Sequence, residues 1–239
     1  MKKKSFNFAP ISKKRIKMAM SKSIEEQVED YFKSELKRFD VQYYNKNEFI
    51  NDAIDRALKN AHSKSGGTGN NYPDIKVLLT TRNNRQIPVM IEAKGQKNRL
   101  VKHDSNGQIE LIDKKGSRNA IVNFAVNGAV HYANALLDEG SYKEVLAVGL
   151  NGHKLGSEIE YEVAVYYVSE SNAREPIELK RYKDLSFLSV QNLDQLVQEL
   201  DTITLTEEQK ERLKAIKHSE LEKAVKAIHQ SIYDDMSFS

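Results

Sequence analysis

Two acidic residues and one lysine stand beside short apolar runs in the segment from Tyr72 to Gln96. Asp74 precedes the run Ile-Lys-Val-Leu-Leu, and Glu92 and Lys94 end the run Pro-Val-Met-Ile-Glu-Ala-Lys. Charged side chains are rarely tolerated in an ordinary buried strand unless they are paired. Two carboxylates held close together need either a shared proton or a cation. A divalent ion such as Mg²⁺ meets this need, because it takes oxygen ligands and uses one or two protein carboxylates.

The two apolar runs predict a β-hairpin whose connection spans residues 80–86. Because side chains alternate along a strand, Glu92 and Lys94 should point to one face of the hairpin and Ala93 to the other. If the strands pair across this connection, Asp74 joins Glu92 and Lys94 at one edge of a sheet. In the alternative interpretation, Glu92 and Lys94 form only a surface ion pair on an edge strand.

Pro73-Asp74, the hairpin and Glu92-Ala93-Lys94 resemble the PD-(D/E)xK motif of restriction-endonuclease-like enzymes. Two flanking segments, residues 57–69 and 124–133, extend the likeness. With them, the chain resembles the N-terminal nuclease domain of fused restriction-modification proteins, in which an adenine-N6 DNA methyltransferase follows on the same polypeptide. The resemblance covers residues 45–150.

The resemblance implies an α/β protein with a restriction-endonuclease-like core (αβββαβ, a central mixed sheet flanked by helices) and a C-terminal helical extension. It implies a Mg²⁺-dependent DNA endonuclease, with Mn²⁺ as a substitute, whose catalytic residues are Asp74, Glu92 and Lys94. Asp74, Glu92 and the backbone carbonyl of Ala93 would hold the metal, which neutralises phosphate charge and activates water. Lys94 would orient the attacking water and stabilise the transition state.

A further metal ligand is expected on a helix ahead of the hairpin, because nucleases of this type often carry an extra acidic residue there. Glu48, Asp52 and Asp55 are the candidates, and we favour Glu48 at the start of a helix predicted over residues 46–62. For any one of these residues, a solvated position on an amphipathic helix is the better explanation.

Basic residues gather around the predicted site. Residues 76–120 contain ten Lys or Arg against four Asp or Glu, and phosphate contacts from such residues dominate affinity for nucleic acid. Gln96, Lys97 and Lys102 follow the second strand and are candidate DNA contacts. Simple solvent exposure is the other interpretation of Gln96. The glycine-rich segment 65–71 could lie against a phosphate or serve only as a flexible connection.

Composition gives no sign of a membrane segment and places much of the positive charge in the N-terminal tail. The formal net charge is +3, but eight of the positive charges lie in residues 1–22, so the remaining 217 residues carry −5. A basic tail of this kind can follow a phosphate backbone, although basic termini also occur on proteins that never meet DNA. The chain has no cysteine, and it shows neither an apolar run long enough for a bilayer nor a secretory signal. We expect a cytoplasmic protein.

The chain begins with a basic tail (1–22), and the resemblance implies a nuclease domain (23–200) followed by a helical linker (201–239) toward a missing methyltransferase region. No methyltransferase motif follows, so we expect a fragment of a longer chain that also carries methyltransferase and target-recognition regions. Double-stranded DNA is the expected substrate, and cutting both strands would call for a transient dimer. The alternatives are a DNA-binding module that keeps this fold without cutting, and an assembly module that docks through its last helix. The predicted elements are helices over 24–38, 46–62, 120–137, 193–200 and 206–232, the hairpin, strands over 144–150 and 160–169, and a short strand or loop over 41–44.

Overall fold

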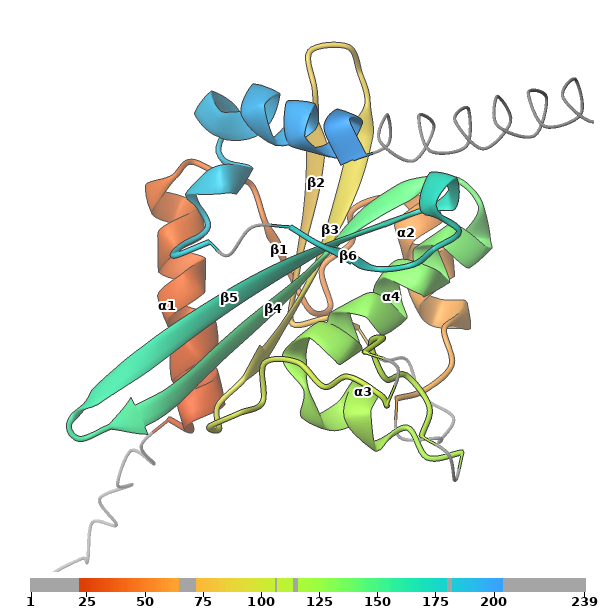
Figure 1. The fold of residues 1–239 in the computed structure, drawn as a ribbon. Coiled ribbons are helices and arrows are strands. Elements are labelled where there is room, and N and C mark those ends of the chain that lie inside the picture. Colours follow the sequence, from red (N-terminus) through yellow and green to blue (C-terminus); the bar gives the residue numbers. More distant parts are fainter. Residues whose placement is uncertain (1–21, 65–71, 106, 114–115, 180–181, 204–239) are drawn as a thin grey trace, which may run out of the picture.

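A six-stranded mixed sheet lies between helices on both faces in the computed structural model (Figure 1), which describes residues 22–64, 72–105, 107–113, 116–179 and 182–203. The strands follow one another in chain order across the sheet, and every neighbouring pair is antiparallel except β3 and β4. The predicted α/β class is confirmed. The labelled elements are α1 (Ile24–Arg38), β1 (Tyr44–Asn45), α2 (Asp52–Asn60), β2 (Ile75–Thr80), β3 (Gln86–Lys94), α3 (Asn119–Asn123), α4 (Ala125–Glu139), β4 (Glu144–Leu155), β5 (Glu158–Ser169), η1 (Glu170–Asn172), β6 (Ile177–Glu178) and η2 (Ser186–Leu188).

Helix α1 has the bounds that its sequence predicts. Ser23 accepts a hydrogen bond from the Glu26 backbone N–H, and the Glu26 carboxylate binds the Ser23 N–H in return, which completes a capping box. Val28, Phe32 and Leu36 form its buried stripe and pack in one apolar cluster with alternate residues of β2 and β3. This helix therefore covers one face of the sheet.

The predicted hairpin is confirmed as β2 and β3. The two strands pair from Ile75 opposite Ile91 to Thr80 opposite Gln86, and the Thr81 N–H closes the connection by donating to the Arg85 carbonyl. Asp74 is the residue immediately before β2, so it directly precedes the first pair of the hairpin.

Helix α4 covers the other face and makes the crossover from β3 to its parallel neighbour β4. Val126, Ala129, Val130 and Ala133 are fully buried and belong to a second apolar cluster, together with α2 and Met90 of β3. The helix approaches β4 so closely that a Cβ atom on Gly149 would lie 2.8 Å from the Val126 backbone nitrogen. Glycine at this place permits the contact.

Some helices differ from the predicted ones because hydrogen bonds fix their ends elsewhere. The helix expected over 120–137 is divided into α3 and α4 at Phe124, whose backbone is extended. There the N–H groups of Ala125 and Val126 donate to the carbonyls of Arg99 and Leu100. The helix expected over 46–62 begins only at Asp52, because the Asn51 side chain caps it by accepting from the Ile54 N–H.

Strand bounds differ as well. The short strand or loop expected over 41–44 is observed as strand β1 at Tyr44–Asn45, whereas β4 and β5 exceed the predicted strands because they pair with each other from Glu144 opposite Ser169 to Leu155 opposite Glu158.

A helix over residues 190–203 ends the described chain and contains the short helix predicted at 193–200. Arg85 ties it to the sheet, since its guanidinium binds Glu144 at 2.6 Å and Asp201 at 2.6 Å. The basic tail, the glycine-rich segment 65–71 and the helix predicted over 206–232 lie outside the described residues. Nothing in the structure tests the predicted domain boundaries.

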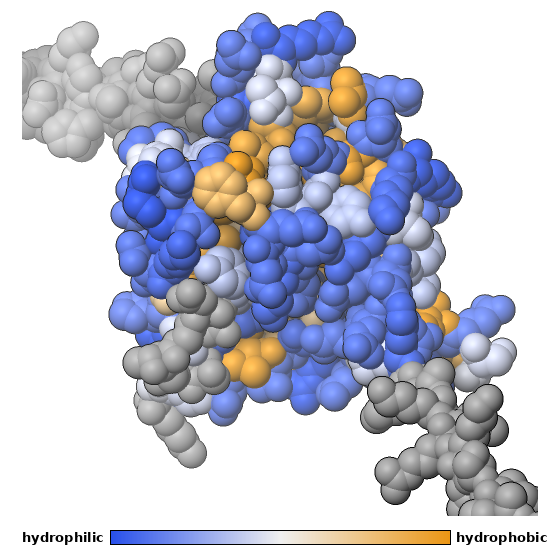
Figure 2. Space-filling model, turned by 180° about the vertical axis from the view of Figure 1, so that it is seen from behind, coloured by the Kyte–Doolittle hydropathy of each residue, from blue (hydrophilic) through white to orange (hydrophobic). Residues whose placement is uncertain are grey.

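Figure 2 shows the face opposite to that of Figure 1, where hydrophilic side chains surround small separate groups of apolar ones. No helix within the described ranges is long and apolar enough to cross a membrane.

Candidate active site

The end of β3 brings the three predicted catalytic residues together. The register of the hairpin, with Ile75 opposite Ile91, places Asp74 across from Glu92. Asp74 Oδ2 accepts a hydrogen bond from the Ala93 N–H at 2.9 Å, and Lys94 Nζ lies 3.7 Å from Glu92 Oε2.

Glu92 is fully buried, with an exposed fraction of 0%. Burial raises the pKa of its carboxyl to about 7, and the neighbouring Asp74 carboxylate adds to this effect, while Lys64 and Lys94 oppose it. Its Oε2 has no hydrogen-bond partner among the described residues. Helix α4 passes directly over this oxygen, because a Cβ atom on Gly128 would lie 3.3 Å from it. An unpartnered carboxylate oxygen at such depth is costly.

Two hydrogen bonds fix the position of the Lys94 ammonium. Its Nζ donates to the Ala93 carbonyl at 2.8 Å and to Glu25 Oε1 at 3.2 Å. Burial alone would lower the pKa of Lys94, but the carboxylates of Glu92, Glu25 and Asp74 together raise it. The side chain therefore stays a charged ammonium, as the proposed orienting role requires.

Three further charged residues reach the site, and the sequence alone did not assign any of them to it. Lys64 Nζ lies 2.8 Å from Glu92 Oε1, and Lys46 Nζ lies 3.8 Å from Asp74 Oδ1. Glu25 reaches Lys94 because Gly95 lets β3 end against α1; a Cβ atom on Gly95 would lie 2.3 Å from the Glu25 nitrogen. These contacts join segments far apart in the chain.

The acidic pair also affects the pKa of two more side chains. Burial and then Asp74 raise the pKa of Glu29. Burial, Glu92 and Asp74 raise the pKa of Tyr132 on α4, whose buried hydroxyl has no hydrogen-bond partner within the described ranges. Tyr132 thus lies near the two carboxylates.

The donor set suits a hard divalent cation. Asp74, Glu92 and the Ala93 carbonyl supply only oxygen, and among the residues that the structure describes none donates a hydrogen bond to Glu92 Oε2. Mg²⁺ is commonly bound by one or two carboxylates with water completing the shell. No cluster of three or more His, Cys, Asp or Glu side chains that could hold a metal occurs in the described part of the chain. A metal here would therefore depend on two carboxylates, the carbonyl and water.

Glu48 does not lie on a helix, contrary to the prediction, because α2 begins only at Asp52. Its carboxylate binds the backbone N–H of Asn45 at 2.6 Å and the Asn45 side chain at 3.0 Å. These hydrogen bonds lower the pKa of Glu48. The acidic helix residue that meets the site is Glu25 on α1, through Lys94.

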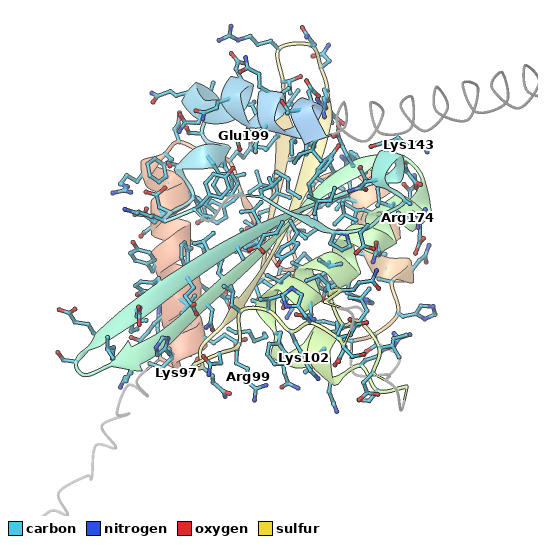
Figure 3. All side chains as sticks on the ribbon, viewed as in Figure 1. Lys97, Arg99, Lys102, Lys143, Arg174 and Glu199 are labelled. Atoms are coloured by element: carbon cyan, nitrogen blue, oxygen red, sulfur yellow. The ribbon has the colours of Figure 1, made fainter. Side chains whose placement is uncertain are left out.

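The candidate DNA contacts follow β3 along the molecule's edge. Figure 3 shows Lys97, Arg99 and Lys102 along the loop that leaves the strand. Gln96 and Lys97 are exposed, whereas Lys102 is half-buried and pairs with Glu110.

Helix α4 holds the loop that follows β3 in place, since the Asn127 side chain accepts from the Lys102 N–H and donates to the Lys102 carbonyl. Gln96 also lines a shallow hollow of about 560 Å³ with Glu25, Glu29 and Gly95, beside the Lys94 ammonium.

Comparison with known proteins gives one partial likeness. Over 64 residues, 26% of this chain and 9% of the relative, the sequence is 42% identical to the type II restriction enzyme and methyltransferase RM.BcgI of Heyndrickxia coagulans. No family model and no solved structure matches the chain. The chain is thus similar, over a short part of its length, to a fused restriction enzyme and methyltransferase.

Proposed function

We propose that this chain is the Mg²⁺-dependent endonuclease domain of a restriction-modification enzyme and that it hydrolyses phosphodiester bonds in double-stranded DNA. The observation that carries the proposal is the fully buried Glu92 beside Asp74, with the Lys94 ammonium 3.7 Å from Glu92 Oε2. The partial likeness to a restriction enzyme and methyltransferase supports it.

The fold supports the proposal too. Helix α1, the antiparallel strands β1, β2 and β3, helix α4 and the parallel strand β4 follow one another, which is the αβββαβ order of a restriction-endonuclease-like core. Helices α2 and α3 are additions to that order. The acidic pair then lies at the hairpin end, as in the PD-(D/E)xK motif.

Each residue of the site has a distinct task. Asp74 and Glu92 would hold Mg²⁺ or Mn²⁺, which when bound neutralises phosphate charge and lowers the pKa of a water. The Lys94 ammonium, anchored on the Ala93 carbonyl and Glu25, would orient the attacking water and stabilise the charge of the transition state. The Ala93 carbonyl oxygen can bind a metal only if it accepts the Lys94 hydrogen bond and the metal together, or if that hydrogen bond breaks.

The proposed partners follow from the same site. Gln96, Lys97 and Lys102 would contact DNA phosphates along the loop beyond β3, with Arg99 in the same loop (Figure 3). Methyltransferase and target-recognition regions on a longer chain would choose the sequence that is cut. A transient dimer would bring a second site to the other strand.

Calorimetric titration with Mn²⁺ tests the metal site directly. Wild type should bind the ion and Asp74→Ala should not, whereas Asp55→Ala should bind as wild type does, because Asp55 pairs with Lys59 on α2. With metal and DNA present, Lys94→Ala should lose cleavage while keeping its fold. Wild type that binds neither Mn²⁺ nor Mg²⁺ would favour the alternative, a non-cleaving DNA-binding or assembly module.

A further inference from the structure

The ammonium of Lys64 lies inside the candidate site, although the residue belongs to neither strand of the hairpin. Its Nζ donates to Glu92 Oε1 at 2.8 Å, and only 15% of its side chain is exposed. The same nitrogen lies 5.1 Å from the centre of the Tyr132 ring, where the ring face attracts a cation. Two independent contacts therefore hold this lysine against the buried carboxylate.

We propose that Lys64 is a stand-in cation, which offsets the charge of the Glu92 carboxylate in place of a divalent metal ion and must leave that carboxylate when the metal binds. This inference rests on the proposed function, since it assumes that Glu92 is a metal ligand. Neither of the other two lysines plays this part, because Lys94 is held by the Ala93 carbonyl and by Glu25, and Lys46 pairs with Asp74.

Electrostatics explains why the site would need such a cation. Asp74 and Glu92 are like charges at the end of one hairpin, and a carboxylate taken out of water is costly unless a partner offsets its charge. Lys64 supplies one positive charge at 2.8 Å from Glu92 Oε1. The empty site can then stay folded before any metal arrives.

Metal binding would reverse this balance. Mg²⁺ binds oxygen at about 2.1 Å, so an ion on Glu92 would come close to an ammonium that contacts the same carboxylate. Repulsion between the two cations then drives the ammonium away, and the flexible four-carbon stem of lysine lets it move. The metal therefore binds against a built-in competitor, and removing Lys64 should tighten metal binding.

Three variants of the 239-residue chain test the inference. Lys64→Met removes the charge, Lys64→Arg keeps it, and Lys59→Met removes one charge from the exposed Asp55–Lys59 pair on α2 as a matched control. Mg²⁺ is titrated calorimetrically at alkaline pH, so that the carboxyls are ionised in every variant. We expect Lys64→Met to bind Mg²⁺ about tenfold more tightly than wild type, a change of about 1.4 kcal/mol. Lys64→Arg and Lys59→Met should stay close to wild type.

The outcomes separate this inference from the proposed function. Wild type that binds no Mg²⁺ would refute the metal site itself. Wild type that binds it, with Lys64→Met binding equally or more weakly, would refute only the stand-in role. Should Lys64→Met fail to fold, a crystal structure of wild type with Mn²⁺ decides. Nζ beyond hydrogen-bond reach of Glu92 Oε1 supports the inference, and Nζ still bound there overturns it.

Discussion

Replacing Asp74 with asparagine and with alanine separates two roles of its carboxylate. Its Oδ2 accepts the Ala93 N–H at 2.9 Å, and its charge adds to burial in raising the pKa of Glu92 to about 7. Asparagine keeps an acceptor oxygen at this place but carries no charge, whereas alanine removes both.

The expected stabilities differ for that reason. Ala93 is fully buried, so Asp74→Ala leaves a buried N–H without a partner at a cost of about 1–3 kcal/mol. Both variants also relieve Glu92 of a like charge, which offsets part of any loss. Asp74→Asn should therefore unfold close to wild type. For a urea m-value of about 3 kcal/mol/M, the midpoint of Asp74→Ala should fall by about 0.3–1 M.

Urea denaturation followed by circular dichroism, with a calorimetric Mn²⁺ titration of each variant, checks both roles. Metal binding should be lost in both variants although only Asp74→Ala is less stable. Undiminished Mn²⁺ affinity in Asp74→Asn would refute the assignment of Asp74 as a ligand. Equal midpoints for Asp74→Ala and wild type would refute the importance of the hydrogen bond to Ala93.

Three further substitutions probe how the fold supports the site. Gly128→Ala should weaken Mn²⁺ binding in calorimetry, because its Cβ would lie 3.3 Å from Glu92 Oε2 and 3.0 Å from the Ile121 carbonyl; unchanged affinity would contradict the close passage of α4. Gly149→Ala should lower the free energy of unfolding by about 1–3 kcal/mol, since its Cβ would lie 2.8 Å from the Val126 nitrogen. A urea midpoint equal to that of wild type would show that α4 can shift freely. Arg85→Ala should cost about 2 kcal/mol and speed amide exchange in residues 190–203, because Arg85 joins Glu144 to Asp201; unchanged exchange there would mean that the apolar contacts hold this helix alone.

Local sequence signals were sufficient where the chain interacts with its near neighbours. The Ser23–Glu26 capping box and an apolar stripe define α1 within one stretch of sequence. The hairpin likewise depends on two adjacent strands and one turn. Alternation along β3 and the register of the hairpin then place Asp74 opposite Glu92, so the central geometry of the site followed from the sequence.

Contacts between distant segments could not be predicted in this way. The break at Phe124 depends on the carbonyls of Arg99 and Leu100, which accept the first N–H groups of α4. Lys64 reaches Glu92 across 28 residues of sequence, and no local pattern marks it. Glu25 is absent from the candidates Glu48, Asp52 and Asp55 for the same reason, because only the packing of α1 against Gly95 brings Glu25 to Lys94.

A buried carboxylate at position 92 lowers the stability of the fold. This cost is the strongest reason to seek a function for Glu92. Glu92 is fully buried and keeps one oxygen without a hydrogen-bond partner in the described part of the chain. Burial raises the pKa of Glu92 to about 7 although Lys64 and Lys94 oppose the rise, so ionisation of this carboxyl above pH 7 costs folding free energy.

Glu92→Gln keeps the shape and an acceptor for Lys64 and cannot ionise, so above pH 7 we expect its free energy of unfolding to equal or exceed that of wild type by about 1–3 kcal/mol. Urea denaturation measures the gain, and Mn²⁺ calorimetry should show that binding is lost. If Glu92→Gln were less stable and still bound Mn²⁺, the carboxylate would serve the fold. In that case the ion pair with Lys64, and not a metal, would explain why a charge is buried there.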